Sequence, residues 1–338
     1  RNTYYFLPLL LGIAGLVYQF RRDKKGFTMV SLLFVFTGIA IAFWLNQHPL
    51  QLRERDYSYA GSFYSFALWM GIGSFALFQQ LKLRHRNFRN AIVVITLFGL
   101  AVPVLMGVQN YDDHNKSKRR TSVEMAYNYL TGLAPNAILF TNGDNDTFPL
   151  WYAQEVEGVR TDVRVVNYML ASGSWYVHQL ATKVYDSEPL PLSLTKAQYE
   201  RGTNDYVPYV GREGVDRVDV QEIIRFIASD NSTTQVQASS GKRLNFFPTK
   251  KFRLKVDSAA CVDNGIVPRE LADQIVPYIE WDVKKNHFFK NDLMLMDFLA
   301  NFNWSRPLYL ASPAAIEDVF DVSQYCHLEG FVYRFMPV

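Results

Sequence analysis

Long apolar stretches dominate the first hundred or so residues of the chain. Four of them, residues 4–20, 27–45, 60–81 and 91–108, contain no Asp, Glu, Lys or Arg. A helix needs about 20 apolar residues to cross the hydrocarbon core of a bilayer. A large soluble core is the alternative, but four uncharged runs in succession argue against it. The pattern therefore predicts a bundle of four transmembrane helices over residues 1–109. The lack of ionisable groups within the spans argues against an ion pump or channel.

The loops between these stretches differ in charge, and this difference predicts the orientation. RRDKKG and KLRHRNFR, the first and third loops, hold four Lys or Arg residues each, whereas the second has only Arg53 and Arg55, beside Glu54 and Asp56. Cytoplasmic loops carry the excess of Lys and Arg, so the segment after residue 108 is predicted to lie outside the cytoplasm. The basic residues after the fourth span point the other way (Lys116, Lys118, Arg119, Arg120). Long domains cross the membrane largely regardless of charge, so the short loops decide.

From about residue 110 the pattern becomes that of a soluble α/β domain. TSVEMAYNYLTG predicts a helix with Thr121 as N-cap and Glu124 as its capping-box partner. AILF (137–140) and VRVVNY (163–168) predict buried strands. The intervening Phe148, Trp151, Tyr152 and Val156 are spaced as one helical face.

The order strand, helix, strand is typical of a parallel crossover unit. SWYVHQLATKVY predicts the next helix, with Ser174 as its cap, and later segments predict further elements (helices in 218–229 and 291–302, the latter capped by Asp292, and strands at 251–256 and 307–311). We therefore expect residues 110–338 to form one α/β domain with a partly parallel sheet. In such sheets ligands bind outside the carboxyl ends of the strands. TNGDND, directly after the first strand, occupies that position.

The segment NGDNDTFP allows three interpretations. The first is turn chemistry alone, with Gly143 at positive φ, Asp146 as helix cap and Pro149 in the first turn. The second is a divalent cation site formed by Asp144, Asn145 and Asp146, similar to the acidic triplet of nucleotide-sugar glycosyltransferases.

The third interpretation is a recognition loop in which Asp144 accepts hydrogen bonds from a substrate that packs on Trp151 or Tyr152. A calcium loop would need a bidentate Glu, and Glu155 and Glu157 lie too far along the next helix. One acidic triplet supplies few oxygens, so we favour recognition without a metal ion or other cofactor.

Other chemistry is weakly indicated. A net charge of +3 without a basic, aromatic stripe does not favour nucleic-acid binding. His287 and His327 have no partner at ligand spacing, and His178 is expected on an exposed helix face. There is neither a glycine-rich phosphate loop nor a local Ser-His-acid pattern. Cys261 and Cys326 form no metal motif, and whether they pair is left open.

Three stretches carry a resemblance to a known family. They are NAILFTNGDNDTFPLWYAQEVEGVRTDVRVVNYMLASGSWYVHQL, IEWDVKKNHFFKNDLMLMDFLANFNWSRPLYLASP and LEGFVYRFMPV. They resemble segments of large multi-pass membrane proteins common in Bacteroidetes, formerly a domain of unknown function and now grouped with protein O-mannosyltransferase-like enzymes as glycosyltransferase family 117. The resemblance implies a GT-C type enzyme that moves a sugar from a lipid-phosphate carrier to Ser or Thr of translocated proteins.

The resemblance also limits the assignment of residues. The catalytic acid of such enzymes is expected in the first external loop, so this chain is expected to be a C-terminal part without that loop, and no catalytic residue can be assigned. The place of NGDND is similar to that of the acceptor loop of oligosaccharyltransferases, which is an analogy of architecture only.

The sequence thus predicts the C-terminal part of a bacterial inner-membrane glycosyltransferase with a periplasmic domain. Its expected partners are the lipid bilayer, a lipid-linked sugar donor and a protein acceptor, and no nucleic acid. The expected substrate-binding residues are those of the loop and the helix after it (Asn142, Asp144, Asn145, Asp146, Trp151, Tyr152). A non-enzymatic membrane subunit that presents a periplasmic domain to a larger assembly is the alternative.

Overall fold

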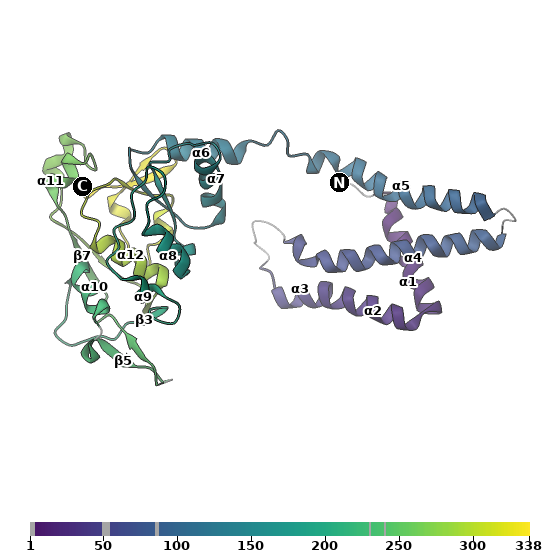
Figure 1. The fold of residues 1–338 in the computed structure, drawn as a ribbon, viewed down its shortest axis with the longest axis horizontal. Helices are drawn as coiled ribbons and strands as arrows, with labels where there is room; N and C mark the ends of the chain where they lie inside the picture. The colour runs from purple at the N-terminus through teal and green to yellow at the C-terminus, as the bar shows by residue number, and fades with distance from the viewer. Residues whose placement is uncertain (1–3, 49–54, 85–87, 230, 240) are drawn as a thin grey trace. The chain divides into compact units, whose positions relative to one another are not determined.

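The computed structural model describes residues 4–48, 55–84, 88–229, 231–239 and 241–338 (Figure 1). The chain divides into two compact units, residues 1–118 and 119–338. The division falls after the boundary expected at residue 109, because the last helix of the first unit continues to His114. Arg53, Glu54 and Arg86, which entered the argument from loop charges, lie outside the described residues.

The first unit is helical. Its elements are η1 (Tyr4–Phe6), α1 (Leu7–Arg22), α2 (Lys24–Phe34), η2 (Val35–Ile39), α3 (Ala40–Leu45), η3 (Asp56–Tyr59), α4 (Ala60–Arg84) and α5 (Phe88–His114). Three segments of the described chain are long and apolar enough to cross a membrane: Lys24–Leu45, Asp56–Leu81 and Ile92–His114. They match the second, third and fourth predicted spans. The first prediction, 4–20, corresponds to η1 and α1, and the 16 residues of α1 are fewer than the ~20 of a typical span.

Helices α1 and α4 approach each other closely through glycines. A Cβ atom on Gly15 would lie 1.8 Å from the carbonyl oxygen of Trp69, so only glycine allows this contact. The indole of Trp69 also donates a 2.9 Å hydrogen bond to Oε1 of Gln19. The backbones of α1 and α4 are therefore in direct contact at Gly15.

The second unit contains a five-stranded mixed sheet in the order β11-β12-β10-β1-β2. Its strands are β1 (Ile138–Thr141), β2 (Arg164–Asn167), β10 (Leu308–Leu310), β11 (Cys326–Glu329) and β12 (Val332–Phe335). β1 is parallel to both β10 and β2, with Ile138 opposite Leu308 and Arg164. β12 is antiparallel to β10 and to β11. The predicted strands at 137–140, 163–168 and 307–311 and the partly parallel sheet are thus confirmed.

Helices cover both faces of this sheet. On one face, α6 (Thr121–Thr131) and α7 (Asp144–Glu155) pack through residues such as Leu130 and Leu150 against Leu139 of β1. On the other face lie α8 (Ser174–Leu180) and α12 (Lys290–Ala300). The alternation of side chains in β1 explains this, because Ile138 and Phe140 point to the face opposite that of Leu139.

Smaller sheets extend the unit beyond α12. One joins β4 (Val218–Asp219), β7 (Lys251–Lys255) and β8 (Tyr278–Asp282), and two pairs join β3 (Tyr206–Pro208) to β9 (His287–Phe289) and β5 (Gln235–Gln237) to β6 (Arg243–Asn245). The helices of this part are α9 (Lys196–Tyr199), α10 (Val220–Ala228) and α11 (Ser258–Asp263). The predicted helix in 218–229 and the half-exposed strand at 251–256 are confirmed.

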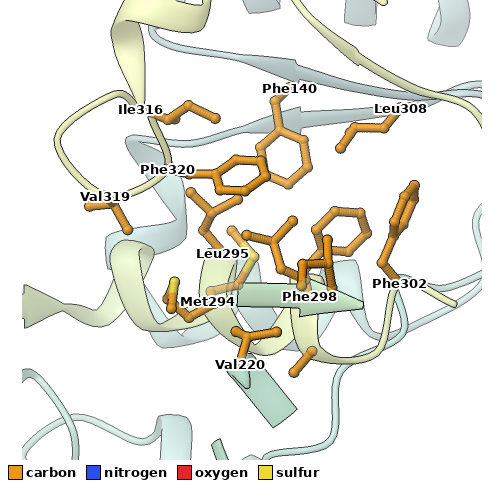
Figure 2. Packing of buried hydrophobic residues seen from close by; sticks show 14 of the residues in the cluster. Phe140, Val220, Met294, Leu295, Phe298, Phe302, Leu308, Ile316, Val319 and Phe320 are labelled. Atoms are coloured by element: carbon orange, nitrogen blue, oxygen red, sulfur yellow. The ribbon is translucent and has the colours of Figure 1, made fainter. Parts of the chain in front are cut away.

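Helix α12 is the centre of the larger core. All of its residues are buried. Figure 2 shows Phe140 and Leu308 of the sheet, Val220 of α10, and Ile316, Val319 and Phe320 around the Leu295 and Phe298 side chains of α12. The core thus joins the main sheet to the smaller ones.

Three predicted helix starts are wrong in detail. Arg120, not Thr121, is the N-cap of α6, and it makes no side-chain cap bond. Ser174 is the first residue of α8 and Gly173 its N-cap. Phe289 is the N-cap of α12, and Asp292 reaches back from the third helical position to its backbone N–H at 2.8 Å.

The end of α8 also differs from the expectation. The spacing of Val177, Leu180, Ala181 and Val184 predicts one inward face, but the helix stops at Leu180 and Ala181 is exposed. Val184 is half-buried in the segment after the helix, which turns back through a bridge between Val184 and Ser187. The local apolar spacing continues past Leu180, but the chain leaves the helix there.

Candidate functional site

The loop TNGDND leaves β1 at the carboxyl end of the parallel strands. β1 ends at Thr141, β2 ends beside it at Asn167, and α7 begins at Asp144. Only Asn142 and Gly143 separate the strand from the helix. The predicted position at the carboxyl edge of the sheet is therefore the observed one.

A buried polar cluster fixes the loop to the sheet. The hydroxyl of Thr147 donates to the carbonyl of Gly143 at 2.6 Å and lies 2.6 Å from the hydroxyl of Thr141. The side-chain amide of Asn167 donates to the same Thr147 oxygen at 2.9 Å. All three side chains are buried, so the loop is held by bonds that water does not reach.

Asp146 has a structural role in the loop. Its carboxylate accepts hydrogen bonds from the backbone N–H groups of Asn142 and Gly143, both at 2.8 Å. The turn interpretation correctly predicted that Asp146 accepts hydrogen bonds from backbone N–H groups at the start of the helix. It does so from the third helical position and not as the N-cap. Gly143 has φ −136°, not a positive φ, and Pro149 lies in the second turn because α7 begins at Asp144. Backbone conformation therefore gives no reason for glycine at 143.

Asp144 is placed differently from Asp146. The side chains of Asn142, Asp144 and Asn145 are exposed. Asp144 has no ion pair and no side-chain hydrogen bond with any residue that the structure describes. A carboxylate at the first position of a helix is compatible with the helix dipole, yet its oxygens stay available to a ligand.

Two aromatic residues of the predicted α7 face, Phe148 and Tyr152, point to solvent, whereas Trp151 is half-buried against both cores. Phe148 is 49% exposed and Tyr152 is 43% exposed, and Val156, just after the helix, is exposed as well. The sheet instead contacts the opposite side of the helix, where Leu150 and Ala153 are buried. The rings of Phe148 and Tyr152 are thus free for other contacts.

A row of rings continues this face toward α8. The ring of Phe148 lies 5.7 Å from that of Trp151, which lies 6.0 Å from that of Tyr176, and Trp175 is 5.5 Å from Tyr176. Neither Trp175 nor Tyr176 is among the residues predicted from the sequence to bind substrate. The signal was present, since Trp175 and Tyr176 directly follow the expected cap Ser174 at the carboxyl edge of the next strand.

Metal ligands are not gathered at the loop. In the described part of the chain there is no group of three or more His, Cys, Asp or Glu side chains that could hold a metal ion. Glu155 and Glu157 accept hydrogen bonds from Tyr185 and Tyr127. Neither glutamate therefore joins Asp144 and Asp146 in a group of three such ligands.

The remaining candidates lie elsewhere. His178 is half-buried, with Nε2 3.3 Å from the carbonyl of Lys196, and the ring of His287 stacks on Tyr206 at 4.9 Å. Cys261 and Cys326 are both free thiols. Burial raises the pKa of each thiol to about 12, so neither is a reactive nucleophile at neutral pH.

Comparison with known protein families gives a match over the second unit of the chain. The family model described as TMEM260-associated domain 2 matches residues 122–338. No curated protein and no solved structure matches the chain. The matched range includes β1, the NGDND loop, α7 and the sheet, and it covers more than half of the chain. The chain therefore belongs to the TMEM260-associated domain 2 family.

Proposed function

We propose that this chain is the C-terminal part of a membrane glycosyltransferase that moves a sugar from a lipid-phosphate carrier to Ser or Thr of translocated proteins. Three candidate membrane spans and the family match support this proposal. A lipid-linked donor cannot leave the bilayer, so an enzyme that uses it must itself be held in the membrane. The chain's resemblance to O-mannosyltransferase-like enzymes agrees with this chemistry.

The role that we assign to the α/β unit is recognition of the acceptor protein. One observation carries it: Asp144, Phe148 and Tyr152 recur every four residues, lie on one face of α7, and are all exposed. A carboxylate without a partner can accept hydrogen bonds from backbone N–H or hydroxyl groups of an acceptor. Exposed aromatic rings supply contact area at a low cost in side-chain entropy.

The other proposed binding residues divide by function. Asn142, Asn145 and Trp151 would add polar and aromatic contacts around Asp144. Asp146 would act indirectly, because its carboxylate is occupied by the backbone of the loop. The catalytic acid would come from a part of the enzyme outside this chain, and we assign no catalytic residue here.

We further propose four spans, with α1 as the first, and an external α/β unit in the periplasm of a bacterium. Cysteine labelling tests this topology. Arg55→Cys, between the second and third spans, should react with an impermeant thiol reagent in spheroplasts, whereas Lys24→Cys, at the junction of α1 and α2, should not. Cys261 and Cys326 give little background, because burial raises the pKa of both thiols to about 12. The reverse labelling pattern would contradict the orientation.

The transfer reaction itself is tested with the full-length protein that contains this segment. Radiolabelled lipid-linked sugar and a protein acceptor should give labelled acceptor, released by cleavage of an O-glycosidic bond. No transfer to any acceptor would contradict the enzyme and favour a non-enzymatic subunit. If the triple variant Asp144→Ala, Phe148→Ser and Tyr152→Ser still transfers sugar, the protein is an enzyme but α7 does not recognise the acceptor.

A further inference from the structure

A pocket lies beside β2, the edge strand of the main sheet. Its volume is about 190 Å³, and it is bounded by α7 on one side and α8 on the other. Val163 and the first two residues of β2, Arg164 and Val165, line it. Trp151 and Trp175 contribute to its walls, so the pocket adjoins the aromatic row that begins on α7.

The edge of β2 presents the backbone N–H and C=O of one residue, Val165, to this pocket without a partner. The N–H groups of Arg164 and Tyr168 donate to carbonyls of the β1 segment, at 2.9 and 2.8 Å. Backbone groups alternate in direction along a strand, so those of Val163, Val165 and Asn167 point away from β1.

Side chains satisfy the two flanking positions of this edge. The carbonyl of Val163 accepts from Nε2 of Gln154 at 2.9 Å, and the N–H of Asn167 donates to the hydroxyl of Tyr176 at 2.9 Å. Between them, the N–H and C=O of Val165 have no hydrogen bond to the described part of the chain, although the residue is only 5% exposed. Buried backbone groups are nearly always paired, so this position is suited to a partner from outside.

Arg164 supplies a second unsatisfied group in the same place. It is only 6% exposed, and its Nη2 donates to the carbonyls of Leu180, at 3.0 Å, and of Thr182. Its Nε is buried without a partner, and no carboxylate forms an ion pair with it among the residues described. Burial lowers the pKa of Arg164, because the charged form is desolvated. An anionic ligand would relieve that cost.

Two other arginines of the unit also have a buried Nε without a partner, and they show why Arg164 differs. Arg334 forms a 3.1 Å ion pair with Glu329. Arg253 lies over the ring of Tyr278, 5.0 Å from its centre. Neither lines this pocket. Arg164 therefore combines burial, a missing counter-ion and access to a cavity.

The segment after α8 closes the outer side of the pocket by exposed bonds. The hydroxyl of Tyr185 donates to Glu155 of α7, and the hydroxyl of Thr161 donates to Asp186 at 2.6 Å. Exposed side-chain bonds of this kind contribute little stability and can break to admit a ligand.

We propose that this pocket binds a short extended peptide segment, whose backbone pairs with Val165 and whose carboxylate bonds to Arg164. Addition of a strand to a free sheet edge uses such main-chain pairing, with side-chain pockets for specificity. A sugar acid or a lipid phosphate could neutralise Arg164, but the outward N–H and C=O pair of one strand residue favours a peptide. The inference does not depend on glycosyl transfer.

Peptide binding to the purified chain in detergent tests the proposal by calorimetry. Three pentapeptides with N-terminal acetyl groups serve as probes: one with a central Asp and an amidated end, one with Asn in its place and a free carboxyl end, and one with Asn and an amidated end. At least one of the two anionic peptides should bind about tenfold or more tightly than the neutral one, the effect of one charged hydrogen bond. Tighter binding of the Asp peptide would show that Arg164 binds a side-chain carboxylate, and tighter binding of the peptide with a free end would show that it binds a C-terminal carboxylate. Equal affinity for all three, or no binding, would overturn the proposal.

Two further arms separate the charge from the strand pairing. Arg164→Gln should remove the preference for the anionic peptide, whereas Arg253→Gln, the same change in another strand, should keep it. In a series of peptides, each with a single N-methylated amide, methylation at the position that pairs with Val165 should abolish binding. This measurement uses the wild-type protein, so it remains possible if Arg164→Gln fails to fold. Binding that tolerates every N-methyl group would refute the strand pairing. Loss of peptide binding would leave the transfer assay unaffected as a test of the proposed enzyme.

Discussion

Helices α7 and α12 begin in the same way and have opposite environments. Each has an aspartate at its third position, Asp146 or Asp292, that accepts a hydrogen bond from the N–H of the N-cap residue. Every residue of α12 is buried, and Asp292 also binds Lys285 at 2.9 Å and the hydroxyl of Tyr168. In α7, by contrast, Asp144 has no side-chain partner in the described part of the chain, and Phe148 and Tyr152 face solvent.

The comparison distinguishes two kinds of aspartate: one whose oxygens are bonded within the protein, and one whose oxygens remain available to a ligand. An aspartate whose oxygens are all used by the protein has no capacity for a ligand, and its loss is felt as lost stability. An exposed carboxylate beside exposed rings contributes little to stability, and the role that we propose for it is to bind a partner. The predictions below test this division, beginning with the largest expected effect.

Asp292→Asn should destabilise the protein most. The substitution removes the charge that pairs with Lys285 and replaces one of the two acceptor oxygens with a donor amide. Either Tyr168 or the Phe289 N–H then loses its acceptor, in a site where Asp292 is fully buried. Removal of one member of a buried pair should cost about 3 kcal/mol. Chemical denaturation of the chain in detergent measures it, with Asp144→Asn as the matched control. A cost below ~1 kcal/mol would contradict the structural role of Asp292.

Asp146→Ala should have an intermediate effect. Two backbone N–H groups lose their acceptor, and the loss of a helix cap of this kind costs about 1 kcal/mol. The same denaturation measurement applies, and Asp144→Ala should leave the free energy of unfolding nearly unchanged. If the two variants were equally destabilised, Asp144 would have a structural role that the contacts do not show.

The ion pair of Asp162 should make stability depend on acid pH. Its hydrogen bond from Arg160 lowers the pKa of Asp162 in the folded protein below the usual 3.8. The stabilisation is therefore complete above about pH 4 and is lost as the pH falls through the lower folded value. Asp162→Asn should be less stable than wild type at pH 7, and the difference should shrink toward pH 2. A difference that stays constant over this range would rule out the ion pair as its cause.

Phe148→Ser and Tyr152→Ser should have the smallest effect on stability. Both side chains are exposed, so each change should alter the free energy of unfolding by no more than ~0.5 kcal/mol. Leu150→Ala, on the buried side of the same helix, is the control and should cost about 2 kcal/mol or more. Equal costs on both sides of α7 would mean that the aromatic face is covered in the folded protein.

Much of the fold could be predicted from local patterns. Wholly apolar runs such as AILF identified the parallel strands, since a strand buried on both faces leaves no polar positions. Because NGDND directly follows the first of these strands, the sequence also predicted its location at the carboxyl edge of the sheet. Helix starts were less accurate, because an aspartate can satisfy backbone N–H groups from the third position as well as from the cap, as Asp146 and Asp292 both do.

The direction of the aromatic face could not be predicted, because spacing shows that residues share a face but not what that face contacts. Phe148 and Tyr152 match a core stripe by spacing, yet the small Ala153 and Leu150 fit against the sheet. The pocket required the order of the strands as well, which places β2 at an edge. An arginine within VRVVNY was a sign of it, because a charged residue in a buried strand needs a partner.

The central claim, that the exposed face of α7 recognises an acceptor, is tested most directly by Asp144→Ala in the full-length protein. We expect unfolding like that of wild type and a loss of transfer to the protein acceptor of about tenfold or more, as for one charged hydrogen bond. Asn136→Ala, in the turn before β1, is a control at the opposite edge of the sheet, and its transfer should change little. Transfer at the wild-type rate by a normally folded Asp144→Ala protein would contradict the claim and leave NGDND as a turn that only begins a helix.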